Sequence, residues 1–125
     1  MINSSTVPQI LAIDDDELTL SFYRGFARKF GYGITEARNA GEALSLANDE
    51  MAVALVDLQL PDMGGLQLIT EIQRRFPLMQ MIIVSSSSSF SDAVAAIRLG
   101  VFDFVQKPVV FSSLHASVQR SLDRY

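Results

Sequence analysis

The sequence predicts a single α/β domain of the (βα)5 type, a doubly wound parallel five-stranded sheet with helices on both faces. Three observations support this prediction. Five short apolar runs recur along the 125 residues, and segments with helical spacing lie between them. Strand and helix therefore alternate five times. The runs also lack the polar alternation of half-exposed strands, which is typical of a parallel sheet that helices bury on both sides.

The apolar runs place the strands at residues 10–13, about 31–35, 53–56, 81–84 and 101–105. Each run is far shorter than the roughly 18 consecutive apolar residues that a membrane span needs. Residues 1–9 have no basic start and no long apolar stretch, so they do not resemble a signal peptide. We therefore expect a soluble, cytoplasmic protein that makes no membrane contact.

Helical spacing and stop residues place the helices. Leu18, Phe22, Phe26 and Phe30 fall four residues apart and are expected to line one face of a helix that Gly31 ends. Asn39, followed three residues later by Glu42, has the pattern of a helix N-cap. Three further stripes are Leu68, Ile69, Ile72 and Phe76 before Pro77, then Val94 and Ile97 before Gly100, and finally Leu114, Val118 and Leu122.

The composition narrows the class of protein. Apolar residues make up 49% of the chain and charged residues 19%, which is enough to build a buried core. The net charge of −4 argues against direct nucleic-acid binding, which needs clustered lysine and arginine. The absence of cysteine excludes disulfides, thiol catalysis and cysteine-based zinc sites. The length fits one domain, which we expect over residues 9–125 after an N-terminal extension at 1–8.

Charged and hydroxyl side chains follow the apolar runs where the strands are expected to end. These residues are Asp14, Asp15, Asp16 and Glu17 after the first run, Asp57 after the third, Ser85 after the fourth and Lys107 after the fifth. Ligands bind at the carboxyl ends of parallel strands, near the point where the strand order reverses. We therefore expect three carboxylates, one hydroxyl and one of only two lysines to meet there. Glu36, after the second run, is expected to lie to one side.

Such an acidic cluster requires a cation, since two like charges about 4 Å apart repel by roughly 4 kcal/mol at an effective dielectric constant of about 20. A few carboxylate ligands with remaining waters suit Mg²⁺ better than Ca²⁺. A Mg²⁺ with open positions can bridge onto phosphoryl oxygens. Lys107 would add a point charge and Ser85 a hydroxyl donor. Asp57 could then act as the nucleophile that forms an acyl phosphate.

Several of these residues also have a plain structural interpretation. Asp16 and Glu17 could serve only to cap the following helix, and Asp57 alone could be a turn residue. The joint occurrence of matching chemistry at four strand ends is what favours a phosphoryl site. His115, the only histidine, is interpreted as a solvated helix residue because it lacks partners for a metal or catalytic role.

Four segments resemble the receiver domain of bacterial two-component response regulators, the CheY-like family. They are ILAIDDDE at 10–17, VDLQLPDMGG at 56–65, IIVS at 82–85 and AIRLGVFDFVQKP at 96–108. The resemblance covers residues from about 9 to the end of the chain. It implies a flavodoxin-like fold with strand order 2-1-3-4-5 and a signalling domain rather than an enzyme.

The resemblance also implies roles for the residues of the acidic cluster. Asp57 would take a phosphoryl group from a phosphohistidine on a sensor histidine kinase or a histidine phosphotransfer protein, and would also contact the metal. Asp15 would bind Mg²⁺ directly, and Asp14 would help through water. The backbone carbonyl of Gln59 would complete the metal ligands from the protein.

The resemblance also implies roles for residues at the ends of the fourth and fifth strands. Lys107 would pair with the phosphoryl oxygens, and its bond to Pro108 would be cis. Ser85 would bond to the phosphoryl group and shift its loop, while Phe104 would rotate inward on activation. The face built from the fourth helix, fifth strand and fifth helix would then change its affinity for an output domain or a downstream protein, and could form a homodimer.

The chain departs from the family pattern at three places. Ser85 replaces the commoner threonine, and a run of serines continues to position 89. The run puts Ser87 where, with Gln59, it would influence autodephosphorylation in the family. Val109 stands where an aromatic residue frequently follows Lys-Pro. Phe104 fits the family pattern, but it could also be an ordinary core residue.

Other functions stay open at this point. A haloacid-dehalogenase-type phosphatase also uses an aspartyl phosphate, and Asp14 to Asp16 contain its Asp-x-Asp pattern, but Asp57 would then have no role. A receiver-like interaction module without phosphorylation is a second alternative. The end at Tyr125, where the fifth helix should finish, suits either a complete protein or one part of a longer regulator or hybrid kinase.

Overall fold

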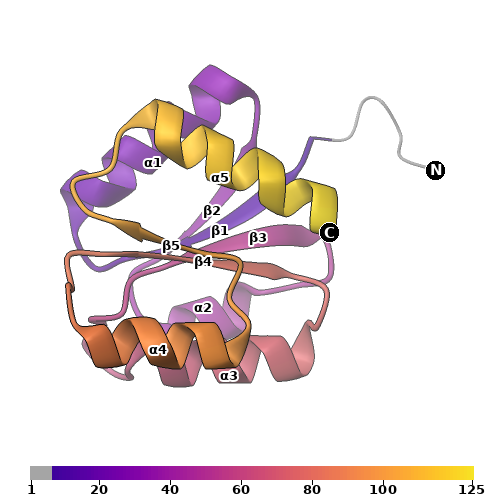
Figure 1. Cartoon of the computed structure of the whole chain (residues 1–125). Coiled ribbons are helices and arrows are strands. Elements are labelled where there is room, and N and C mark those ends of the chain that lie inside the picture. Colours follow the sequence, from indigo (N-terminus) through magenta and orange to yellow (C-terminus); the bar gives the residue numbers. More distant parts are fainter. Residues whose placement is uncertain (1–6) are drawn as a thin grey trace.

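Strand and helix alternate through residues 7–125, the part of the chain that the computed structural model describes (Figure 1). The expected N-terminal extension lies mostly outside the described residues. The elements are β1 (Gln9–Ile13), α1 (Glu17–Phe30), β2 (Gly33–Ala37), α2 (Ala40–Leu46), β3 (Met51–Val56), α3 (Gly65–Arg75), β4 (Gln80–Ser85), α4 (Phe90–Leu99), β5 (Asp103–Gln106) and α5 (Phe111–Arg124). The predicted (βα)5 order is therefore confirmed.

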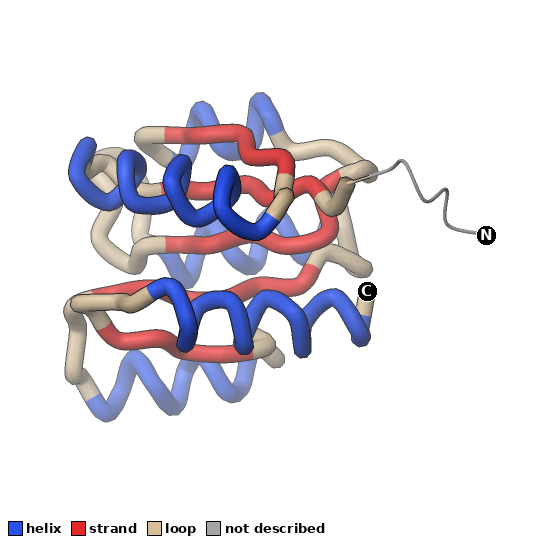
Figure 2. The backbone as a smooth tube through the Cα atoms, turned by 90° about the horizontal axis from the view of Figure 1, so that it is seen from above, coloured by secondary structure: helices blue, strands red, loops and turns tan. Residues whose placement is uncertain are grey.

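The strands lie side by side in one sheet (Figure 2). All neighbouring strands are parallel, as the sequence predicted, and their order is β2-β1-β3-β4-β5, as the family resemblance implied. The order reverses at β1, because β2 pairs on one side of it and β3 on the other. In such a sheet, the crevice at the carboxyl ends of β1 and β3 is the expected ligand site. Residues 14 and 57 are the first residues after these two strands.

Helices cover both faces of the sheet, with α1 and α5 on one side and α2, α3 and α4 on the other (Figure 1). Alternate residues of each central strand enter opposite layers: Ile10 and Ala12 pack with α1 and α5, whereas Leu11 and Ile13 join the second layer. All six residues of β3 are buried, while the edge strands are only partly covered. Full burial of each large aliphatic side chain contributes about 1.5–3 kcal/mol, which makes the central strands a rigid base for the loops at their ends.

Two strands begin about two residues later than predicted, and helix ends explain both shifts. Gly31 adopts the left-handed conformation (φ 78°), and the amides of Gly31 and Tyr32 both donate to the carbonyl oxygen of Ala27. Gly100 (φ 74°) closes α4 in a similar way. These caps occupy residues that were predicted to begin β2 and β5, so both strands start later. The predicted helix ends at Gly31 and Gly100 are confirmed.

The predicted stripes of α1 and α4 are partly wrong. Leu18 is 80% exposed and Ile97 is 76% exposed, so neither belongs to the core. The buried face of α1 instead contains Leu20, Tyr23, Phe26 and Ala27. Spacings of three and four both occur on one helix face, and a strict four-residue series drifts around the helix toward solvent.

The expectation for His115 is also wrong. Its ring stacks on Phe30 with centroids 3.7 Å apart and also contacts Phe26 and Tyr32 edge-on or tilted. The side chain is half-buried between α5 and α1 rather than solvated. The N-cap prediction is confirmed, because the Asn39 side chain accepts a hydrogen bond from the Glu42 amide at 2.8 Å. Within residues 7–125, no helix is both long and apolar enough to cross a membrane.

Candidate functional site

Three carboxylates meet where β1 and β3 end. One oxygen each from Asp14, Asp15 and Asp57 lies within 4.8 Å of the others. Asp14 is fully buried and Asp57 almost so, whereas Asp15 is exposed. The cluster therefore opens to solvent on the side of Asp15, and its oxygen donors match the ligands that hard divalent cations prefer.

The backbone fixes the two buried carboxylates. The amide of Asp14 donates to Ala37 O and that of Asp57 to Ile13 O, at 3.0 and 3.1 Å, so sheet bonding continues past the strand ends. One oxygen of each side chain accepts from an amide two residues further on. Asp14 Oδ1 binds the Asp16 amide at 2.9 Å, and Asp57 Oδ1 binds the Gln59 amide at 3.3 Å. The local turns therefore orient both side chains before any ligand binds.

Lys107 faces the other oxygens of the same two carboxylates. Its Nζ atom donates to Asp14 Oδ2 at 2.7 Å and lies 3.6 Å from Asp57 Oδ2. Its backbone amide donates to Ser85 O at 2.9 Å, which ties β5 to β4 at this point. The Lys107–Pro108 peptide bond is cis, as the family resemblance implied.

The charges in the cluster shift two pKa values. Burial raises the pKa of Asp57, the nearby charge of Asp14 raises it further, and the Gln59 amide and Lys107 only partly oppose this. Burial alone would lower the pKa of Lys107, but its hydrogen bond to Asp14 and the charges of Asp14 and Asp57 raise it overall. The ammonium group thus stays charged beside a carboxylate whose ionisation is costly.

Ser85 ends β4 at the same edge of the sheet, and its side chain is buried. Its hydroxyl accepts a hydrogen bond from the Ser87 amide at 3.2 Å. Among the hydrogen bonds of the described residues, none joins this hydroxyl to Asp57. The structure therefore brings the predicted carboxylates and Lys107 together, while the Ser85 hydroxyl is engaged with its own loop.

The remaining acidic residues near β1 have structural roles. Asp16 is the residue before α1 and accepts from the Thr19 hydroxyl at 2.9 Å. Glu17 pairs with Arg24 and Arg38. Glu36 lies to one side, as expected, and pairs with Arg24 at 2.6 Å. Asp16 therefore takes the N-cap position of α1, but its side chain binds the Thr19 hydroxyl and no helix amide, so the capping interpretation is only partly confirmed. Glu17 belongs to an ion-pair network outside the cluster.

Phe104 and Gln59 lie near the site in different ways. Phe104 is partly buried in β5 and packs against the core layer of α2, α3 and α4. Gln59 follows Asp57 and forms an isolated bridge with Gly64. This bridge closes the loop between β3 and α3, so residue 59 is held beside the carboxylates.

Sequence reasoning missed two positioning residues, one in the β3–α3 loop and one at the start of α3. Asp62 accepts hydrogen bonds from the amides of Ala40 and Gly41 at 2.8 and 2.9 Å, which anchors the loop to the start of α2. These bonds lower the pKa of Asp62. Gly65 packs directly against the backbone of Asp57 and Leu58. Both residues lie in the PDMGG segment, whose turn-forming composition was the available clue.

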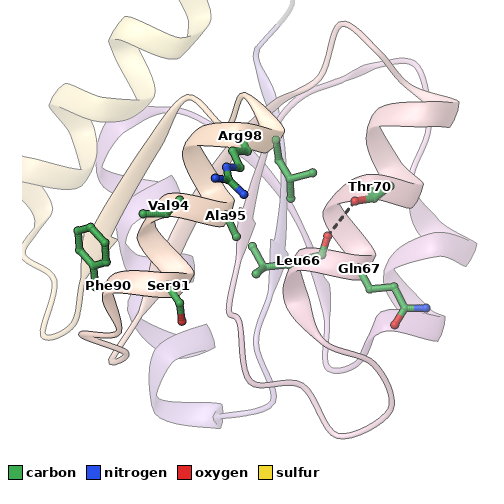
Figure 3. A pocket seen from close by; sticks show the side chains of 9 residues that line it. Leu66, Gln67, Thr70, Phe90, Ser91, Val94, Ala95 and Arg98 are labelled. Atoms are coloured by element: carbon green, nitrogen blue, oxygen red, sulfur yellow. Dashed lines mark hydrogen bonds between the residues drawn. The ribbon is translucent and has the colours of Figure 1, made fainter.

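One hollow adjoins this edge of the sheet, and a larger one lies between two helices of the second layer. One, of about 420 Å³, adjoins Lys107 and is lined by α1 and by the residues after β5, including Leu18 and Pro108. The other, of about 610 Å³, lies between α3 and α4 (Figure 3). Figure 3 shows Phe90 and Arg98 at opposite ends of the α4 wall, with Leu66 and Thr70 on the α3 wall.

The fold and the site together define a doubly wound α/β domain with a cluster of three carboxylates, paired with a lysine, at the strand-order reversal. Residues 10–119 match the family model described as the response regulator receiver domain. The chain is 34% identical over 116 residues to the transcriptional regulatory protein GlrR of Escherichia coli K12, covering 92% of this chain and 26% of that protein. It is 31% identical over 117 residues to the DNA-binding transcriptional regulator NtrC of the same organism, covering 93% and 25%.

Solved structures agree with these matches. A CheY-like receiver domain protein from Methanospirillum hungatei JF-1 superimposes with a TM-score of 0.89 at 30% identity, covering 94% of this chain and 95% of that one. The chain therefore belongs to the response regulator receiver domain family. It is a signalling domain rather than an enzyme of the haloacid-dehalogenase type. It spans about a quarter of the length of the curated relatives named above.

Proposed function

We propose that Asp57 accepts a phosphoryl group and that Asp14, Asp15 and the carbonyl of Gln59 hold a Mg²⁺ ion beside it. The observation that carries this proposal is the convergence of three carboxylate oxygens within 4.8 Å, with Lys107 Nζ 3.6 Å from Asp57 Oδ2. The all-oxygen donor set fits Mg²⁺. The ion, when bound, supplies positive charge that neutralises the carboxylates and the transferring group.

The residues of the chain can perform the transfer by positioning and charge compensation. An Asp57 carboxylate oxygen attacks the phosphorus atom, the O–P bond forms as the P–N bond of a phosphohistidine breaks, and the imidazole leaves and takes a proton from solvent. The backbone amide of Gln59 holds the attacking carboxylate in place. Lys107, already beside Asp57, neutralises the phosphoryl oxygens. The Ser85 hydroxyl would move and donate a hydrogen bond to the bound phosphoryl group.

The donor would be a sensor histidine kinase or a histidine phosphotransfer protein in the cytoplasm. The hollow beside Lys107 supports a docking place for the donor, because Lys107 lines the hollow and also contacts the carboxylate cluster, and the wall includes the exposed Leu18. A partner that covers this hollow could bring a histidine side chain to Asp57. Burial of exposed apolar side chains such as Leu18 would stabilise that encounter.

The output would be carried by the face of α4, β5 and α5. Phe90 and Ile97 lie on α4 and are 82% and 76% exposed, which supports contact with a further surface. The relatives named above are transcriptional regulators of which this domain is about a quarter. We therefore propose that the face controls an output domain or a downstream protein, with a homodimer through the same face as one form of that control.

Labelling with a small phosphodonor tests the phosphoacceptor role. Phosphoramidate is suitable because it contains the P–N bond of phosphohistidine. With Mg²⁺, the intact protein should gain the mass of one phosphoryl group, and a chelator should prevent the gain. Asp57→Asn should abolish labelling, and Lys107→Ala should slow it at least tenfold, whereas Asp123→Asn, an exposed control on α5, should label normally.

Persistent labelling of Asp57→Asn would contradict the assignment. Absence of labelling in the wild type would favour a receiver-like interaction module.

A further inference from the structure

The serine run after β4 forms a hydrogen-bonded network that links Ser85 to the first turn of α4. The Ser87 amide donates to Ser85 Oγ at 3.2 Å, and the Ser87 hydroxyl donates to Asp92 Oδ2 at 2.8 Å. The Ser89 amide donates to the Ser87 hydroxyl at 3.2 Å. Ser87 is thus the only residue of the run that contacts both Ser85 and Asp92 in these bonds.

The helix start is held by the same residues. Ser89 is the N-cap of α4, and its hydroxyl accepts from the Asp92 amide at 3.3 Å. Asp92 therefore bonds to the N-cap residue Ser89 through its backbone amide and to Ser87 in the loop through its side chain. A carboxylate in the first helical turn is also favoured by the helix dipole, so Asp92 is well placed to accept a charge-assisted hydrogen bond.

This arrangement opposes the motion that the proposed function requires. The Ser85 hydroxyl makes no hydrogen bond to Asp57 among the described residues and is instead bonded to the Ser87 amide. If Ser85 moves to bind a phosphoryl group on Asp57, as the proposed function requires, the Ser87 amide bonded to its hydroxyl has to move with it or release it. The loop cannot move freely while Ser87 is bonded to Asp92, because that bond fixes it to a regular helix.

We propose that the Ser87–Asp92 pair is a latch that holds the β4–α4 loop in the conformation where the Ser85 hydroxyl accepts from the Ser87 amide, and so slows phosphorylation. This inference deepens the proposed function and rests on it. Ser87 and Asp92 act as positioning residues through Ser85, and neither contacts Asp57. The latch also fixes Phe90, which lies between Ser89 and Asp92 and is 82% exposed. Its release therefore changes the surface that α4 presents.

The latch makes the loop conformation a two-state equilibrium that single substitutions can shift. The Ser87–Asp92 bond is only partly buried, which weakens its charge-assisted character, so its loss should raise the population of the released loop about threefold to tenfold. If phosphorylation proceeds from the released loop, the labelling rate should rise by the same factor. Ser87→Ala and Asp92→Ala remove one partner each.

The test combines two measurements on wild type, Ser87→Ala, Asp92→Ala and the double variant. Amide hydrogen exchange of the unphosphorylated protein, read at Ser87 and in the first turn of α4, should be faster in each single variant. The rate of labelling by phosphoramidate with Mg²⁺ should rise about threefold to tenfold in both. The double variant should match the single ones, because either substitution already opens the latch. Ser91→Ala is the control: among the described residues its hydroxyl has one hydrogen bond, to that of Ser89, and the substitution should leave both readouts unchanged.

Three outcomes would overturn the inference. Unchanged exchange in the single variants would show that the pair does not hold the loop. Additive effects in the double variant would show that Ser87 and Asp92 act separately. Faster exchange with unchanged labelling would show that the loop does not limit phosphorylation. A wild-type protein that takes no label would instead refute the proposed function and the kinetic half of the inference, while hydrogen exchange, which needs no phosphoryl group, would still decide whether the latch exists.

Discussion

Gly65 lies against the backbone of Asp57 so closely that no larger residue fits there. A Cβ atom at position 65 would stand 2.5 Å from the Asp57 carbonyl oxygen and 2.6 Å from the Cα atom of Leu58. The Gly65 amide also donates to Leu58 O at 3.0 Å. The first residue of α3 therefore presses on the segment that presents the central carboxylate of the site.

Substitution of Gly65 by alanine should consequently displace Asp57. We expect Gly65→Ala to lower the free energy of unfolding by about 1–3 kcal/mol, the usual cost of overpacking a rigid region, and to slow labelling by phosphoramidate. Gly64→Ala is the matched control, because a Cβ atom there meets nothing within 4 Å and its φ of −64° suits alanine. Urea unfolding of both variants measures the difference, and equal losses would contradict the close-contact explanation.

Local patterns were sufficient to predict most of the fold. Apolar runs buried on both faces predicted the parallel sheet, and Gly31, Gly100 and Asn39 marked helix ends correctly. Burial of individual residues was harder to predict, as Leu18 shows. Its exposure depends on the direction in which α1 faces the sheet, which the packing of Leu20 and Phe26 decides and which no single-helix pattern contains.

The meeting of the site residues was easier to predict than the burial of single side chains. Parallel topology brings all carboxyl strand ends to one edge, so residue type and strand order were enough to bring Asp14, Asp57 and Lys107 together. The Ser87–Asp92 bond was not predictable, because it depends on a loop conformation and on side-chain rotamers. The stacking of His115 on Phe30 was missed for a similar reason, since it joins α5 to α1 across 85 residues of sequence.

The charge of Asp57 should make the metal-free protein less stable as the pH rises. Because the pKa of Asp57 is raised by burial and by Asp14, the folded protein binds more protons than the unfolded chain between the two pKa values, and stability falls as the pH rises through that window. Asp57→Asn should therefore raise the free energy of unfolding at pH 7 in a chelator. The gain should disappear below the unfolded-state pKa of about 3.9. A gain that persists undiminished in acid, measured by urea unfolding, would point to packing instead.

Divalent cations should stabilise the protein through the same carboxylates. At a Mg²⁺ concentration of about 100 times the dissociation constant, binding to the folded state alone adds roughly 2.7 kcal/mol to the free energy of unfolding. Asp15→Asn should remove most of this gain, because it takes one ligand from the cluster without changing a buried residue. Asp123→Asn removes an exposed carboxylate elsewhere and should keep it. Thermal unfolding with increasing Mg²⁺ provides the measurement, and equal gains in all three proteins would indicate non-specific binding.

His115 should contribute to stability through its contact with Phe30, although neither residue belongs to the site. The rings stack with centroids 3.7 Å apart at an interplanar angle of 20°. Such pairs contribute about 0.5–1.5 kcal/mol beyond the area that they bury. We therefore expect His115→Ala to lower the free energy of unfolding by about 1 kcal/mol or more, whereas Gln119→Ala, at an exposed position one turn later on α5, should change it by less than about 0.5 kcal/mol. Adding Phe30→Ala completes a double-mutant cycle. Additive losses in the cycle would show that the two rings do not stabilise each other in solution.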